Sequence, residues 1–305
     1  MNPAGEIPDS FRRTILAVHG EAGEAWLEGL PNLLDECAER YGLEWEALFP
    51  RHWYNFLAPA RMPDGRRCVL KCGVPGRGIR AEIALLDAYA GRPTVRLLAS
   101  DPEIGVALLE RIEPGTTLVD LASDDDDLRG VQAASDLMVR LRMPPDTVPW
   151  IEPVGEWLEV FDRIAAREAY AAVAALIADA RSVARELLES SPEVYLLHGD
   201  LHHQNILLDK SRGWLAIDPM GVVGEPAVEI AVFVRNLWQD RHKRTDPAAT
   251  MRRRIHAFCD LLGLDRHRAH AWCFVLSMVS TAWSIEDGED DWPDSAAITR
   301  MLAVD

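Results

Sequence analysis

The chain has 305 residues, of which 48% are hydrophobic, so it is long enough to bury a sizeable core in one large domain or two lobes. Its formal net charge of −17 disfavours binding to nucleic acid or anionic lipid and would attract cations. No run approaches the roughly 18–20 apolar residues of a membrane-spanning helix, and residues 1–13 lack the basic start and apolar core of a signal peptide, so we expect a cytoplasmic location.

The first third of the chain is predicted to form a small sheet with helices. Hydrophobic periodicity predicts helices over residues 21–40 and 79–90, and β-type runs predict strands over residues 51–60, 66–71, 95–99 and 106–111. Met62-Pro63-Asp64-Gly65 is typical of a turn between the first two strands. The character of the sequence changes after this region, so we expect an N-terminal lobe of residues 1–112.

The rest of the chain, residues 113–305, is predicted to form a mainly helical lobe. Helices are expected over residues 124–142, as one or two helices across 155–190, and over 226–238, 247–262, 266–285 and 295–304. A short β interlude interrupts them, with strands over residues 195–197, 206–209 and 214–217. The predicted fold class is therefore α+β, with a mixed first lobe and a helical second lobe.

One stretch in the β interlude carries the strongest chemical signal. His198, Asp200 and Asn205 form the pattern H-x-D-x-x-x-x-N, a predicted hairpin follows, and Asp218 opens an Asp-x-x-Gly. Phosphoryl transfer needs these residue types, because an aspartate must reach the substrate hydroxyl while an amide oxygen and a second carboxylate hold Mg²⁺ against nucleotide phosphates. We therefore expect Asp200 to be the catalytic base, Asn205 and Asp218 to be Mg²⁺ ligands, and ATP to be the co-substrate.

A metal site built from histidines is the alternative interpretation of this stretch. His198, His202 and His203 lack cysteine or carboxylate partners at ligand spacing, so this alternative is disfavoured. The five cysteines form no Cys-x-x-Cys pair, which indicates free, mostly buried thiols. We expect His198 to brace the loop, and the sequence leaves open whether His202 and His203 orient Asp200 or face the substrate.

The same stretch resembles the catalytic and metal loops of the aminoglycoside phosphotransferases, which carry a glycine, here Gly199, where protein kinases usually have arginine. The following segment GEPAVEIA, which begins at Gly224, is similar to the helix start of this family. Val234-Arg235-Asn236 and the N-terminal stretch YNFLAPA are similar to its streptomycin 6-kinase and hydroxyurea kinase branch. The resemblance spans residues 52–236 and implies a protein-kinase-like, two-lobed fold.

The resemblance also implies a nucleotide site in the first lobe. Lys71 ends a predicted strand and would bind the α and β phosphates of ATP while pairing with Glu82 on the next helix. Backbone groups of Glu110 and Ile112 are expected at the adenine edge. No G-x-G-x-x-G precedes Lys71, which leaves the choice between ATP and GTP open.

The acceptor implied by the resemblance is a small, cationic, hydroxylated molecule, and streptomycin, phosphorylated at its 6-hydroxyl, is the best candidate. The acidic chain fits such a ligand. The candidate substrate residues are His202, Glu225, Glu229, Glu286 and Asp287. For Glu225 and Glu229 the favoured alternative is that they cap the helix over 226–238 and complement its N-terminal dipole, and for Glu286 and Asp287 it is a solvated turn. Met220 stands where many streptomycin kinases have lysine.

Other functions stay open at this point. The chain fits a kinase of another small alcohol, an amino-sugar or hydroxyurea. A nucleotide-binding pseudokinase scaffold is disfavoured, because Lys71, Asp200, Asn205 and Asp218 are all present. A protein kinase is disfavoured too, because no long activation loop separates Asp218 from the next helix. We expect a monomer or a homodimer.

Overall fold

The computed structural model of the chain describes residue 3 and residues 7–49, 54–121, 127–191, 193–236 and 246–303. It divides into two compact units, Met1–Gly115 and Thr116–Asp305. The starts of the expected strand 51–60 and helix 124–142, and the ends of the expected helices 226–238 and 295–304, lie outside the described residues. No helix in the described ranges has the length and apolar character that crossing a bilayer requires.

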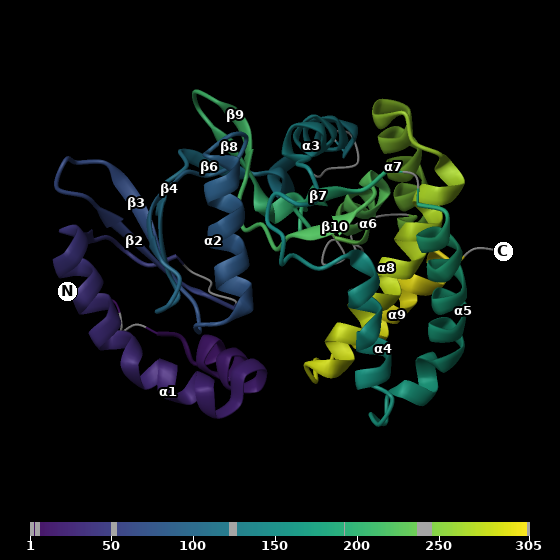
Figure 1. The fold of residues 1–305 in the computed structure, drawn as a ribbon, viewed down its shortest axis with the longest axis horizontal. Helices are drawn as coiled ribbons and strands as arrows, with labels where there is room; N and C mark the ends of the chain where they lie inside the picture. Colours follow the sequence, from purple (N-terminus) through teal and green to yellow (C-terminus); the bar gives the residue numbers. More distant parts are fainter. Residues whose placement is uncertain are drawn as a thin grey trace. The chain divides into compact units, whose positions relative to one another are not determined.

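The first unit is built on a five-stranded antiparallel sheet (Figure 1). The strand order is β1-β2-β3-β5-β4, which places β3 at the centre. The strands are β1 (Glu44–Trp45), β2 (Phe56–Arg61), β3 (Arg67–Cys72), β4 (Leu97–Asp101) and β5 (Val106–Glu110). The four longer strands were expected from the sequence, whereas β1 is too short to leave an alternating pattern. The predicted turn joins β2 to β3, and Gly65 adopts the positive φ of 83° that it requires.

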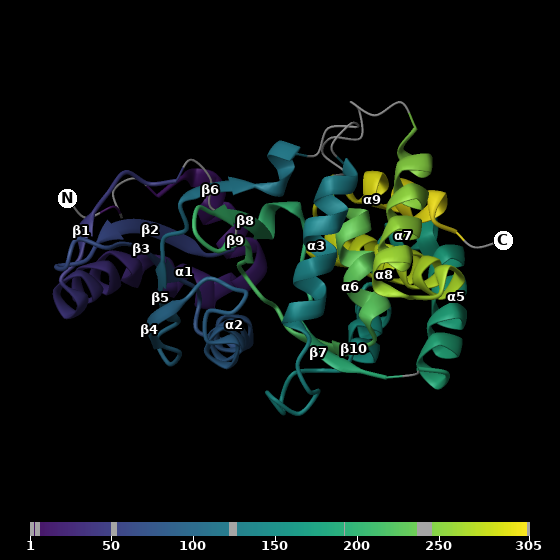
Figure 2. The same cartoon turned by 90° about the horizontal axis from the view of Figure 1, so that it is seen from above.

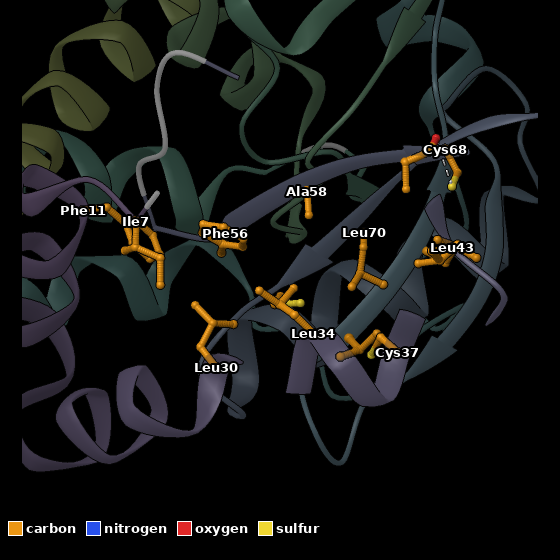
Figure 3. Packing of buried hydrophobic residues seen from close by; sticks show 14 of the residues in the cluster. Ile7, Phe11, Leu30, Leu34, Cys37, Leu43, Phe56, Ala58, Cys68 and Leu70 are labelled. Atoms are coloured by element: carbon orange, nitrogen blue, oxygen red, sulfur yellow. Dashed lines mark hydrogen bonds between the residues drawn. The ribbon is translucent and has the colours of Figure 1, made fainter. Parts of the chain in front are cut away.

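Helix α1 (Asp9–Tyr41) covers one face of this sheet and is longer than the expected helix over 21–40. It is kinked at Gly20, whose φ of 53° and ψ of −133° are not helical. Residues from both sides of the kink, among them Phe11 and Leu30, pack on Phe56 and Leu70 of the sheet (Figure 3). The half of α1 before the kink was not expected from the sequence.

The second unit is mainly helical, as expected (Figure 2). Its helices are α3 (Asp127–Leu141), α4 (Val160–Arg163), α5 (Tyr170–Glu189), α6 (Pro226–Arg235), α7 (Pro247–Leu262), α8 (Arg266–Glu286) and α9 (Trp292–Met301). Short 3₁₀ turns cover Leu118–Leu121, Val154–Glu159 and His203–Asn205, and β6 (Pro114–Thr117) lies at the division between the units. Helix α8 is buried along most of its length and packs against α5, α6 and α9, so it forms the centre of this unit.

Two small sheets hold the loops of interest, a pair of strands and a three-stranded sheet. Strand β7 (Tyr195–Leu197) pairs with β10 (Val222–Gly224), and β8 (Ile206–Asp209) pairs with β9 (Gly213–Ala216) in the sheet of order β6-β8-β9. The carboxylate of Asp209 accepts hydrogen bonds from the backbone N–H groups of Ser211 and Arg212, which closes the hairpin turn. The α+β class with an antiparallel sheet and a mainly helical remainder is confirmed.

Candidate active site

The loop that follows β7 is fixed by a buried carboxylate. Glu229 lies on α6 and is 2% exposed. Its two carboxylate oxygens accept hydrogen bonds from the backbone N–H groups of His198, at 2.9 Å, and Gly199, at 3.0 Å. Burial raises the pKa of Glu229 to about 7, while these N–H donors act in the opposite direction. Helix α6 therefore sets the position from which the loop starts.

His198 braces this loop in a single neutral form. Its Nδ1 accepts a hydrogen bond from the backbone N–H of Asp200 at 3.3 Å, and its Nε2 lies 3.0 Å from the carbonyl oxygen of Ile217. A carbonyl can only accept, so Nε2 carries the proton. Burial lowers the pKa of His198 to about 4, in agreement with a neutral ring. The bracing role expected for His198 thus has a geometric basis.

The backbone of His198 also joins this loop to the loop after β9. Its carbonyl oxygen accepts hydrogen bonds from the N–H groups of Met220, at 3.0 Å, and Gly221, at 2.8 Å. Gly199 has a φ of 81°, and a Cβ at this position would lie 3.1 Å from backbone atoms of Gly221. Both the positive φ and this close approach explain why glycine occupies the position.

Asp200 and Asn205 are linked directly. The amide nitrogen of Asn205 donates to the backbone oxygen of Asp200 at 2.9 Å and to its Oδ2 at 3.0 Å. His202 Nε2 lies 3.5 Å from the same Oδ2, and its Nδ1 accepts from the N–H of Gln204 at 3.2 Å. His202 therefore lies beside the carboxylate of Asp200. Its expected contact with substrate stays a prediction.

The β8–β9 hairpin brings Asp218 to the same end as Asn205. Ile206 pairs with Ala216, and the N–H of Ile217 donates to the carbonyl oxygen of Asn205 at 2.9 Å. Asp218 follows directly and has a φ of 62°, a conformation that is costly for a residue with a Cβ. Strained backbone of this kind concentrates at functional sites. The structure thus brings together Asp200, Asn205 and Asp218.

Lys71 and Glu82 form a buried ion pair in the first unit. Alternation along β3 turns Leu70 and Cys72 toward α1, so Lys71 points to the opposite face of the sheet. Its Nζ lies 2.6 Å from Oε2 of Glu82 on α2 (Arg77–Tyr89). The two residues are 3% and 4% exposed. This is the pairing that the sequence indicated, and burying both charges is costly unless they are paired.

Glu110 and Ile112 lie at the end of β5, but their side chains have other partners. Glu110 accepts a hydrogen bond from the N–H of Arg96 at 2.8 Å and lines an arginine-rich pocket of about 440 Å³. Next to it, Glu46 accepts from Arg67 at 2.6 Å and from Arg111 at 2.7 Å. Hydrogen bonds from Arg67 lower the pKa of Glu46. The expected adenine contacts of the backbone at this strand end stay a prediction.

The remaining acidic candidates are engaged within the protein. Glu225 is 3% exposed and accepts from Arg268 Nε at 2.6 Å and from the indole of Trp272. It stands at the N-cap position of α6, yet its side chain makes no capping hydrogen bond, so that part of the expectation is wrong. Glu286 pairs with Arg163 at 2.5 Å. Asp287 follows α8, and burial together with Glu286 raises its pKa.

Sequence reasoning did not find how α6 supports the loop. Besides Glu229, the ring of Phe233 lies 3.9 Å from that of His203, centroid to centroid. The spacing of Glu229 and Phe233, one helical turn apart in the segment after Asp218, was the signal available. This spacing can be recognised as a signal only when α6 is known to pack against the loop.

Comparison with known proteins places this geometry in a family. The model of the aminoglycoside/hydroxyurea antibiotic resistance kinases matches residues 46–288. The chain is 33% identical over 302 residues to streptomycin 6-kinase of Streptomyces glaucescens, across 98% of this chain and 97% of that protein. It is 32% identical over 301 residues to hydroxyurea phosphotransferase of Kitasatospora aureofaciens, across 97% of this chain and 86% of that protein.

Solved structures agree on the fold. A choline kinase from Streptococcus pneumoniae has a TM-score of 0.65 at 14% identity and covers 90% of this chain and 99% of its own. An aminoglycoside phosphotransferase from Streptomyces rimosus, solved with ADP and streptomycin, has a TM-score of 0.56 at 22% identity and covers 80% and 96%. These likenesses confirm the protein-kinase-like fold. Because the family model matches most of the sequence and the identity to known kinases extends over nearly all of it, the chain belongs to the aminoglycoside/hydroxyurea antibiotic resistance kinases.

Proposed function

We propose that the chain transfers the γ-phosphoryl group of ATP to a hydroxyl of an aminoglycoside-type antibiotic, with streptomycin as the first candidate. The observation that carries the chemistry is the joined pair of Asp200 and Asn205, held by the backbone contacts of His198. The identity to streptomycin 6-kinase over nearly the whole chain supports the choice of acceptor. The net charge of −17 suits a ligand with cationic groups.

In the proposed reaction, the acceptor oxygen attacks the γ-phosphorus, the bond to the β–γ bridging oxygen breaks, and ADP leaves with the electron pair. The carboxylate of Asp200 takes the hydroxyl proton. Residues 1–112 would hold the nucleotide, with Lys71 on its phosphates, Glu82 orienting that lysine, and the backbone of Glu110 and Ile112 at the adenine. Residues 113–305 would supply the base and the acceptor site.

The residues present fit a magnesium ion. The amide nitrogen of Asn205 is used in its bonds to Asp200, so its oxygen is the atom left for a cation. Together with the carboxylate of Asp218, this gives oxygen ligands that Mg²⁺ prefers, while nucleotide phosphates complete its coordination. Bound there, the ion would offset negative charge on the phosphates. We expect Asp218→Ala to abolish the magnesium dependence of nucleotide binding, and unchanged dependence would remove Asp218 from this role.

Three of the candidate residues are proposed to contact the acceptor, namely His202, Glu286 and Asp287. His202 is next to Asp200, so it would contact the acceptor near the reacting hydroxyl. Glu286 and Asp287 would face cationic groups, and Glu286 would then exchange its bond to Arg163 for one to the ligand. Glu225 and Glu229 are fully used inside the protein, which favours supporting roles for them.

Hydroxyurea is the second candidate acceptor, because the relative from Kitasatospora aureofaciens bears that activity in its name and is 32% identical. The two candidate acceptors require different binding sites, because hydroxyurea is small and uncharged whereas streptomycin is large and cationic. Loss of acidic surface residues such as Asp287 would raise the KM for streptomycin and leave that for hydroxyurea unchanged.

The test is ADP release with Mg-ATP against streptomycin, other aminoglycosides, hydroxyurea, choline and homoserine, with Asp200→Asn as the matched control. Turnover of streptomycin that disappears in Asp200→Asn supports the proposal. If only another alcohol is phosphorylated, that alcohol takes the place of streptomycin as the proposed acceptor. If no compound in the panel is phosphorylated although ATP binds, a pseudokinase scaffold is favoured. The cytoplasmic location and the monomeric or homodimeric state stay predictions.

A further inference from the structure

Arg235 is a charged side chain that neither the fold nor the residues above explain. It is the last residue of α6, and it belongs to the Val234-Arg235-Asn236 segment that the sequence singled out. The side chain is half-buried, and its Nε is fully buried with no hydrogen-bond partner in the part of the chain that the structure describes. Burial lowers the pKa of Arg235. Such a guanidinium is unfavourable unless something compensates its charge.

Two contacts show where this charge is directed. The guanidinium carbon lies 6.0 Å from the ring centroid of Trp283 on α8, a cation–π contact that recovers only part of the desolvation cost. The negative charge of Asp200 also acts on Arg235 through space and opposes the lowering of its pKa by burial. The two residues do not form an ion pair within the described ranges, because Asp200 bonds to Asn205 and lies beside His202 instead.

A second half-buried arginine in the same unit provides a contrast. Arg142 is partly desolvated, lies over the ring of Tyr195 and has an unpartnered terminal nitrogen, as far as the described residues go. Its charge, however, faces the carboxylates of Glu229 and Glu193. Within the described residues, Asp200 is the carboxylate whose charge acts on Arg235. An ordinary interaction with the C-terminal dipole of α6 would need no burial of Nε and no proximity to Asp200.

We propose that Arg235 is a further catalytic residue, whose guanidinium donates to an oxygen of the phosphoryl group while that group passes from ATP to the acceptor hydroxyl at Asp200. This inference rests on the proposed kinase function. The forked N–H donors of arginine match the geometry of phosphate oxygens. A transferring phosphoryl group is negatively charged, so it would compensate the buried charge of Arg235. The loop from His198 to Asn205 contains no lysine or arginine of its own, so a positive charge beside Asp200 must come from another element, and α6 offers Arg235.

The proposal is tested with Arg235→Met, which removes the charge at similar length, and Arg235→Lys, which keeps it without the fork. Arg181→Met is the matched control, because Arg181 also lies over an aromatic ring, Phe161 at 5.4 Å, and pairs with Asp162. We expect Arg235→Met to lower kcat about 100- to 1,000-fold, Arg235→Lys about tenfold, and both to change KM less than about threefold. Arg181→Met should leave kcat unchanged.

A binding measurement separates catalysis from structure. Arg235→Met should weaken binding of Mg-ADP with aluminium fluoride, a mimic of the transferring phosphoryl group, at least about tenfold, and leave binding of the non-hydrolysable analogue AMP-PNP unchanged. Equal effects on both nucleotide complexes, or a kcat within about threefold of wild type, would overturn the proposal. If Arg235→Met does not fold, Arg235→Gln takes its place under the same criteria. If the wild-type protein transfers no phosphoryl group to any acceptor, the kinase function itself is refuted. If the wild-type protein is active and Arg235→Met has the same turnover, only the role of Arg235 is refuted.

Discussion

Replacing Gly199 by alanine tests whether the close approach of two backbone segments sets the catalytic geometry. Its φ of 81° costs an alanine about 1–2 kcal/mol. The new Cβ would also lie 3.1 Å from backbone atoms of Gly221, which must shift at a further cost of about 1–3 kcal/mol. The lower entropy of the unfolded alanine variant offsets about 0.4–1 kcal/mol. We expect Gly199→Ala to lose about 1–5 kcal/mol of unfolding free energy.

Gly213→Ala is the matched control for this substitution. Gly213 has a similar φ of 75°, but a Cβ there meets nothing within 4 Å. The control should therefore lose at most about 1.5 kcal/mol and keep its activity, because only the backbone strain and its unfolded-state offset apply. In Gly199→Ala the loop must move Asp200, so kcat should fall by about 100-fold or more. The measurements are urea unfolding and steady-state kinetics on both variants.

Equal stability losses in the two variants would refute the reasoning, because they would show that contact with Gly221 has no energetic weight. Full activity of Gly199→Ala would refute the second step, in which the position of Asp200 depends on this contact. A fall in kcat for Gly213→Ala as large as that for Gly199→Ala would have the same meaning.

Three further predictions concern the same unit. Asp200→Asn should keep its affinity for Mg-ATP while turnover falls by about 1,000-fold or more, and parallel loss of both in calorimetry and kinetics would exclude it as the base. Between pH 6.5 and 4 the unfolded chain protonates His198 before the folded protein does, since its folded pKa is about 4, so this residue should remove about 3 kcal/mol of unfolding free energy. Protonation of Glu229 acts with the opposite sign, because its folded pKa is raised to about 7. The contribution of His198 is therefore obtained by measuring urea unfolding of the wild type and of His198→Asn across this pH range and taking the difference between the two proteins. Asp127→Ala should cost about 3–5 kcal/mol in urea unfolding, because it leaves the guanidinium of Arg254 buried without this carboxylate, and a loss below about 1 kcal/mol would contradict it.

The sequence predicted most of the fold because most elements have a strong period or clear ends. Helices α2 and α7 each match one apolar face, and β3 and β5 follow from short apolar runs. The missed elements are the short strands β1 and β10 and the half of α1 that precedes the kink at Gly20. Strand β1 has two residues, which is too few to show an alternating pattern.

For the site, the sequence predicted residues whose spacing along the chain is fixed by the chemistry. Asp200 and Asn205 lie in one loop, and the hairpin carries Asp218 to them, so local sequence determined their proximity. The partners of Glu225 and Glu229 could not be predicted in this way. Arg268 and Trp272 approach Glu225 from α8, and such contacts depend on tertiary packing rather than on spacing.

The carbonyl oxygen of His198, which receives N–H groups from both Met220 and Gly221, has a consequence for how this enzyme can change over time. Substitutions in either loop displace the same acceptor, so their effects on turnover should not add, and a change tolerated in one background should be harmful in another. Met220 takes part in this junction through its backbone N–H, and its side chain is exposed. Changes of that side chain should therefore be tolerated, whereas changes that move its backbone should disturb the loop of Asp200.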